Sequence, residues 1–129
     1  MQTLDGVHIL LVDDDPDSRE VMKLVMEYQG GLVVAVANTK TALAVLATMK
    51  PDALVTDIAM PEEDGFALVR EARQRGVLDG VPTLALTAFT FSQAQVREAG
   101  FDAYLRKPVD PNKLCTTVQE LVRRRRSDT

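Results

Sequence analysis

Aspartates follow two apolar segments of the sequence, each at the point where the segment ends. Asp13 and Asp14 come directly after residues 7–12, and Asp57 comes directly after residues 53–56. Carboxylates that are crowded together repel one another and are driven toward protonation unless a cation neutralises them. Two or three carboxylates with waters and a carbonyl oxygen are the ligands that Mg²⁺ prefers. These aspartates therefore predict a magnesium site, provided that the fold brings them together.

A hydroxyl group and an ammonium group stand near the ends of two later apolar segments. Thr87 follows residues 83–86, and Lys107 comes shortly after residues 103–105. An aspartate carboxylate can act as a nucleophile toward phosphorus and form an acyl phosphate. Phosphoryl transfer needs mainly alignment and neutralisation of the phosphoryl oxygens, which a metal cation, Lys107 and the Thr87 hydroxyl would provide. The set predicts a phosphoryl acceptor that depends on a cation.

The elements that must position these residues are predicted by the apolar pattern. Five apolar segments rich in β-branched residues alternate with helical periods, which indicates βα units around a parallel sheet. Most of the segments are continuous rather than alternating, as expected for strands covered on both faces. In an open parallel sheet the loops at the carboxyl ends of the strands meet in one crevice, where ligands bind. The predicted strands are residues 7–12, 33–37, 53–56, 83–86 and 103–105.

Capping residues and apolar spacing predict helices between the strands. Asp15 with Pro16 begins the first helix. Ser92 with Gln95 has the spacing of a capping box for a short fourth helix. The predicted inward faces are Val21, Leu24, Val25 and Tyr28 in the first helix, and Leu68, Val69 and Ala72 in the third.

Composition excludes several classes of protein. The chain has 129 residues, of which 46% are hydrophobic and 26% charged, as is typical of one globular domain, and it has no internal repeat or linker. One cysteine and one histidine leave no Cys/His zinc site and no internal disulfide. No apolar segment is long enough to span a bilayer and no export signal is present, so we expect a cytoplasmic protein without membrane insertion.

The net charge of −4 is unevenly distributed along the chain. Residues 123–129 carry four arginines and one aspartate, whereas residues 1–122 carry 18 acidic and 11 basic residues. An acidic body binds phosphate backbones poorly, so we expect no direct binding of nucleic acid. Two interpretations of the arginines stay open. They stabilise the carboxyl end of the last helix through its dipole, or they form a docking patch for an acidic partner or nucleic acid.

The sequence resembles the receiver domains of response regulators in two-component signalling. The resemblance covers roughly residues 7–122 and is carried, in this order, by ILLVDDD, VTDIAMPEEDG, LALTA and YLRKP. It implies a CheY-like, flavodoxin-like α/β fold, (βα)5, with a doubly wound five-stranded parallel sheet of strand order 2-1-3-4-5 in a three-layer sandwich. We expect one receiver domain over residues 1–129, with an arginine-rich end at residues 123–129.

The resemblance also implies a phosphoacceptor and a metal site. Asp57 would accept a phosphoryl group from the phosphohistidine of a sensor histidine kinase or a histidine phosphotransfer domain. Asp14 would bind Mg²⁺ directly and Asp13 largely through water, with Asp57 and the backbone carbonyl oxygen of Ala59 completing the protein ligands. The expected chemistry is limited to phosphorylation of the chain itself and its dephosphorylation, so we expect no separate enzyme activity.

Further residues would carry the response to phosphorylation. By resemblance, Lys107 would pair with Asp57 and then with the phosphoryl group, Thr87 would bind a phosphoryl oxygen, and Tyr104 would rotate inward as the output switch. An output partner, unknown from the sequence, would bind the face formed by the fourth helix, fifth strand and fifth helix, and a phosphorylation-dependent dimer is compatible with this scheme. Phe89 lies where this family tunes access of water, and we predict that it slows dephosphorylation. The segments LALTAF and FDAYLRKPVDP are most similar to receivers of hybrid sensor kinases.

Two other functions would use similar residues. A Mg²⁺-dependent phosphohydrolase of the haloacid-dehalogenase type also has a nucleophilic aspartate, and it is the alternative. It would need a hydroxyl shortly after the acids of the first strand and a cap that excludes water, for which 129 residues leave no room. A flavodoxin-like FMN module would need a phosphate-binding loop after the first strand, where four acids would repel a phosphate.

Overall fold

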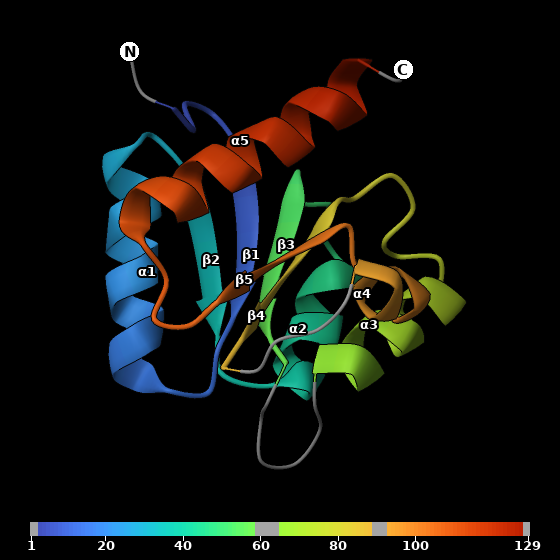
Figure 1. Cartoon of the computed structure of the whole chain (residues 1–129). Helices are drawn as coiled ribbons and strands as arrows, with labels where there is room; N and C mark the ends of the chain where they lie inside the picture. Colours follow the sequence, from blue (N-terminus) through green and yellow to red (C-terminus); the bar gives the residue numbers. More distant parts are fainter. Residues whose placement is uncertain (1–2, 59–64, 89–92, 128–129) are drawn as a thin grey trace.

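The computed structural model describes residues 3–58, 65–88 and 93–127. In this part of the chain, five parallel strands form one sheet in the order β2-β1-β3-β4-β5 (Figure 1). The strands are β1 (His8–Val12), β2 (Leu32–Val36), β3 (Ala53–Asp57), β4 (Thr83–Thr87) and β5 (Ala103–Arg106). The helices are α1 (Pro16–Tyr28), α2 (Thr39–Leu46), α3 (Gly65–Gln74), α4 (Gln93–Glu98) and α5 (Pro111–Ser127). The predicted flavodoxin-like α/β fold is confirmed.

The five strands lie where the sequence predicts them, with ends shifted by one residue. β3 and β4 are buried along their whole length, because helices cover both faces of the sheet. Asp57 and Thr87 are therefore the last residues of two buried, neighbouring strands.

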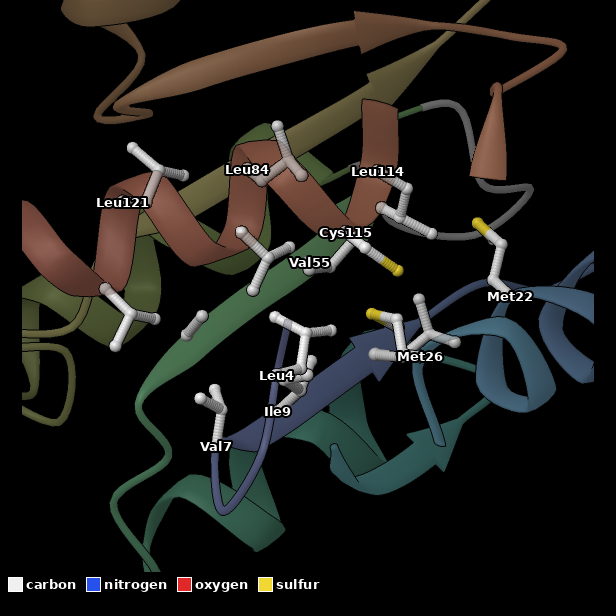
Figure 2. Close-up of a cluster of buried hydrophobic side chains, with 14 of the residues drawn as sticks. Leu4, Val7, Ile9, Met22, Met26, Val55, Leu84, Leu114, Cys115 and Leu121 are labelled. Atoms are coloured by element: carbon white, nitrogen blue, oxygen red, sulfur yellow. The ribbon is translucent and has the colours of Figure 1, made fainter. Parts of the chain in front are cut away.

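Helices lie on both faces of the sheet, so the molecule has three layers (Figure 1). Side chains of α1 and α5, such as Met26 and Leu114, pack against Val55 of β3 on one face (Figure 2). Leu54, the preceding residue of β3, points to the other face and joins the cluster that contains Leu68 of α3. The two clusters hold β3 firmly from both sides, and with it the position of its carboxyl end.

The predicted inward face of α1 is wrong. Three of its four residues are exposed: Val21 (57%), Leu24 (55%) and Tyr28 (79%). The buried residues of α1 are Met22 and Met26, which point into the cluster beneath α5 (Figure 2), and Val25 is only partly buried against that cluster. The helix carries two apolar stripes, and periodicity does not say which of them faces the sheet.

The inward face of α3 is confirmed, since Leu68, Val69 and Ala72 are fully buried. α4 is a short helix, as predicted; it has six residues, and Val96 is buried. Ser92, the predicted cap of α4, lies outside the described residues. Among the helices described, none is long and apolar enough to cross a membrane.

The four arginines near the end of α5 all contact groups of the same chain. The contacts join Arg123 and Arg124 to Glu120, Arg125 to the carbonyl oxygen of Gly80, and Arg126 to Asp52. Hydrogen bonds from Arg123 and Arg124 hold the pKa of the exposed Glu120 carboxyl below its usual range. The contacts of Arg125 and Arg126 tie the end of α5 to the segments that precede β4 and β3. These contacts favour a structural role for the arginines over a docking patch.

Candidate functional site

Side chains from separate loops meet at the carboxyl end of the sheet. Asp13 and Asp14 follow β1, Asp57 ends β3, and Lys107 follows β5. β1 lies beside β3, with Val12 in register with Thr56, so the residues that follow these two positions are close together. The predicted meeting of the first, third and fifth strand ends is therefore observed.

Three carboxylates form a cluster there. One oxygen atom from each of Asp13, Asp14 and Asp57 lies within 4.8 Å of the other two. Asp13 is fully buried and Asp57 is 6% exposed, whereas Asp14 is partly exposed. Like charges at this spacing destabilise one another, and burial adds a desolvation cost to each charge. A set of carboxylate oxygens with one partly solvated member suits a hard divalent cation such as Mg²⁺.

Lys107 supplies one positive charge to this cluster. Its Nζ atom lies 3.0 Å from Oδ2 of Asp57 and 3.2 Å from Oδ2 of Asp13. Burial disfavours the charged ammonium, but the hydrogen bond to Asp57 and the charges of Asp13 and Asp57 outweigh it, so the pKa of Lys107 is raised. Lys107 is thus protonated at neutral pH and balances one of the three carboxylates. A divalent cation would neutralise negative charge that Lys107 leaves unbalanced.

Two residues of α1 that the sequence did not predict also contact the site. The hydroxyl of Ser18 donates to Oδ2 of Asp13 at 2.9 Å. The guanidinium of Arg19 donates to the backbone carbonyl oxygen of Asp13 at 2.8 Å. Their polar side chains five and six residues after Asp13 are ordinary for the first turn of a helix, so the pattern gave no signal for either contact.

The end of β3 is shaped by a close approach of α3. The backbone N–H of Gly65 donates to the carbonyl oxygen of Ile58 at 2.8 Å. A Cβ atom on Gly65 would lie 2.6 Å from the carbonyl oxygen of Asp57, which is too close for any side chain. Gly65 is thus required by the space beside Asp57 and not merely by its place at the start of a helix.

The remaining predicted site residues have separate positions. Thr87 is fully buried at the end of β4. Tyr104 lies in β5, partly buried against the cluster on the α3 side of the sheet. Ala59 and Phe89 lie outside the described residues. The roles of Thr87 and Tyr104 stay predictions.

Comparison with known proteins shows which class of protein has this sheet and this acidic site. Residues 9–119 match the response regulator receiver domain, and the chain belongs to that family. It is thus a receiver domain of two-component signalling with the CheY-like fold.

Two curated relatives differ in how much of their own length this chain covers. A protein of Leptolyngbya boryana, called an uncharacterized 14.6 kDa protein in the sodA1 3′ region, is 44% identical over 123 residues, which cover 93% of each chain. The response regulator MprA of Mycolicibacterium vanbaalenii is 36% identical over 124 residues, which cover 95% of this chain and 53% of MprA. The chain therefore spans about half the length of MprA.

Solved receiver structures share the fold. The receiver domain of the sensor histidine kinase PA1611 from Pseudomonas aeruginosa, with a magnesium ion coordinated in its active site cleft, is 30% identical with a TM-score of 0.82. That likeness covers 91% of this chain and 98% of the PA1611 receiver. A CheY-like receiver from Methanospirillum hungatei is 26% identical with a TM-score of 0.87, over 95% of this chain and 98% of that one.

Proposed function

We propose that this chain is the phosphoacceptor of a two-component phosphorelay, in which Asp57 takes a phosphoryl group from a phosphohistidine. The donor would be a sensor histidine kinase or a histidine phosphotransfer domain. The observation that supports the proposal most is the placement of Asp57. It ends a buried strand, 3.0 Å from the ammonium of Lys107 and beside the carboxylates of Asp13 and Asp14.

The proposed step is a transfer between two nucleophiles. A carboxylate oxygen of Asp57 forms a bond to phosphorus while the bond from phosphorus to the histidine nitrogen breaks, and that nitrogen keeps the electron pair. Lys107, already paired with Asp57, would neutralise a phosphoryl oxygen, and the hydroxyl of Thr87 would donate to another. The later loss of the phosphoryl group to water restores the carboxylate.

The three carboxylates fit a magnesium site, and Asp13, Asp14 and Asp57 would hold the ion together with the backbone carbonyl oxygen of Ala59. Mg²⁺ bound there would supply positive charge to the phosphoryl oxygens. The support is the excess of negative charge that Lys107 leaves unbalanced and the magnesium ion in the related PA1611 receiver.

The output is proposed by likeness to the family. Tyr104 would act as the switch, and a partner would bind the face formed by α4, β5 and α5, with phosphorylation favouring a dimer through the same face. In this proposal residues 1–129 act as one cytoplasmic receiver domain whose only chemistry is its own phosphorylation and dephosphorylation.

One experiment tests the function directly. The purified chain is incubated with acetyl phosphate and Mg²⁺, and its intact mass is measured before and after treatment with base. We expect one phosphoryl group that is stable in acid and labile in base, absent from Asp57→Asn and present in Asp79→Asn, which removes an exposed carboxylate away from the site. A phosphoryl group that persists in Asp57→Asn refutes the proposal. Steady hydrolysis of phosphate esters would favour the phosphohydrolase instead.

A further inference from the structure

The carboxylate of Asp13 accepts hydrogen bonds from three donors. The backbone N–H of Asp15 donates to Oδ1 at 3.0 Å. The hydroxyl of Ser18 and the ammonium of Lys107 both donate to Oδ2, at 2.9 and 3.2 Å. Because Asp13 is fully buried, these donors replace water at its oxygen atoms. Oδ2 is therefore shared between a neutral donor and a charged donor.

The direction of the Ser18 hydroxyl is fixed by the start of α1. Ser18 is the third residue of this helix, and Asp15 is its N-cap. Arg19 donates to the backbone carbonyl oxygen of Asp13, so the first helical turn holds both the backbone and the carboxylate of this residue. Lys107 reaches the same carboxylate from the segment after β5.

Lys107 divides one positive charge between two carboxylates. Its Nζ atom is nearly equidistant from Asp57, at 3.0 Å, and Asp13, at 3.2 Å. The Ser18 hydroxyl already donates a hydrogen bond to Oδ2 of Asp13. This bond reduces the attraction of the Asp13 carboxylate for the Lys107 ammonium. Without that hydroxyl, Lys107 would be the one donor to Oδ2 of Asp13 within the described residues. A buried acceptor that loses a donor is destabilised, and a shift of Lys107 toward Asp13 would restore part of the loss.

We propose that Ser18 is a positioning residue that keeps Lys107 on Asp57. The inference rests on the proposed function, because the position of Lys107 affects activity only if Asp57 receives a phosphoryl group that Lys107 must meet. The hydroxyl is the group that matters, so threonine can replace Ser18 and alanine cannot. Ser18 acts through Asp13 and Lys107 and touches no reacting atom.

The test compares Ser18→Ala and Ser18→Thr with the wild-type chain by two measurements. The first is the NMR signal of the Lys107 side chain in the protein without Mg²⁺. The second is the rate of phosphorylation by acetyl phosphate at saturating Mg²⁺. Alanine is the best helix former, so Ser18→Ala keeps α1. We expect Ser18→Ala to shift the Lys107 signal and to slow phosphorylation about tenfold. Losses of this size are typical when a residue that hydrogen-bonds to a metal ligand is replaced.

Controls separate the hydroxyl from other effects. Ser18→Thr should restore both the Lys107 signal and the rate. Thr116→Val removes an exposed hydroxyl that donates to the carbonyl oxygen of Asn112 within α5, and it should change neither. A Lys107 signal or a phosphorylation rate that is unchanged in Ser18→Ala overturns the proposal. If the wild-type chain takes no phosphoryl group, the proposed function fails, and the Lys107 signal alone decides whether Ser18 holds the ammonium in place.

Discussion

The Nζ atom of Lys107 lies 3.0 Å from Oδ2 of Asp57, across 50 residues of sequence. The side chains are 24% and 9% exposed, so salt and water screen the pair less than an ordinary surface ion pair. The same ammonium also serves Asp13, and the three groups form one electrostatic unit. Loss of the Lys107 ammonium would leave the buried carboxylates of Asp13 and Asp57 without a compensating positive charge. Such a loss destabilises a protein more than the loss of an exposed ion pair does.

Lys107→Met should lower the free energy of unfolding by an amount that depends on pH in a defined direction. The pKa of Lys107 is raised above 10.5 in the folded chain, so its contribution is fully present below the pKa of the unfolded state and is lost as pH rises through the folded pKa. Urea unfolding of wild type and variant should therefore differ by a constant amount up to about pH 10 and converge above it. A difference that widens in strong alkali contradicts the assigned pairing.

Removal of Mg²⁺ should lower the melting temperature of the wild-type chain. A ligand that binds only the folded state stabilises it by mass action. Asp14→Ala should abolish the dependence on Mg²⁺, because it removes the partly exposed member of the carboxylate cluster. Asp17→Ala, which removes an exposed carboxylate of the first turn of α1, should keep it. The melting temperature of each variant is measured by circular dichroism with and without Mg²⁺. If Mg²⁺ raises the melting temperature of Asp14→Ala as much as that of the wild-type chain, the ion binds elsewhere.

Truncation of Met26 should lower the free energy of unfolding much more than truncation of Leu24. Met26 is fully buried under α5, so Met26→Ala should cost about 2–5 kcal/mol of unfolding free energy. Leu24 is 55% exposed, and Leu24→Ala should stay within about 0.5 kcal/mol of wild type. Urea unfolding decides between the face of α1 that the structure gives and the face that its apolar spacing predicts.

The two stripes of α1 show what the sequence can and cannot predict. The positions of the strands along the chain, with Asp57 and Thr87 at two strand ends, follow from short apolar segments that end in polar residues, because a buried strand must end where its burial ends. The order of the strands in the sheet was implied by the family resemblance. The inward stripe of a helix does not follow when a second apolar stripe is present. Met22 and Met26 form the stripe that is buried, and Leu24 belongs to the stripe that is exposed.

The candidate site also has features that the sequence could predict and features that it could not. Asp13 and Lys107 could be predicted as neighbours, because the topology of an open parallel sheet brings all carboxyl ends of its strands to one edge. The contact of Ser18 with Asp13 could not be predicted, because it depends on where the first turn of α1 lies relative to the preceding loop. The requirement for Gly65 depends on a distance between two backbones, which residue types do not reveal.

Cys115 should react slowly with an uncharged alkylating reagent. Burial raises the pKa of its thiol, and its side chain lies among apolar residues between α5 and Met22 and Met26 of α1 (Figure 2). Only the thiolate reacts, so alkylation requires both opening of the structure and loss of the proton. The rate with iodoacetamide near pH 8 should be at least about 100-fold lower than in urea. Comparable rates in buffer and in urea would show that the thiol is not buried between α5 and α1.

Gly65→Ala should damage both the fold and the site. A methyl group at this position meets the carbonyl oxygen of Asp57 at 2.6 Å and the Cα atom of Ile58 at 3.0 Å, so α3 or the end of β3 must move. Overpacking of this kind costs about 1–3 kcal/mol of unfolding free energy. Because the displaced backbone carries Asp57, phosphorylation by acetyl phosphate should slow as well.

The matched control for Gly65→Ala is Gly76→Ala, at the glycine that follows α3. Gly76 has a φ of +74°, and an added Cβ atom would lie 3.9 Å from a carboxylate oxygen of Asp79, so the substitution strains the backbone without crowding. It should cost about 1–2 kcal/mol, the penalty of a left-handed conformation for a residue with a side chain, and leave the phosphorylation rate unchanged. Urea unfolding and the acetyl phosphate assay on both variants separate lost stability from a displaced Asp57. If the two variants lose stability equally and both keep the wild-type rate, the approach of α3 does not position the proposed acceptor.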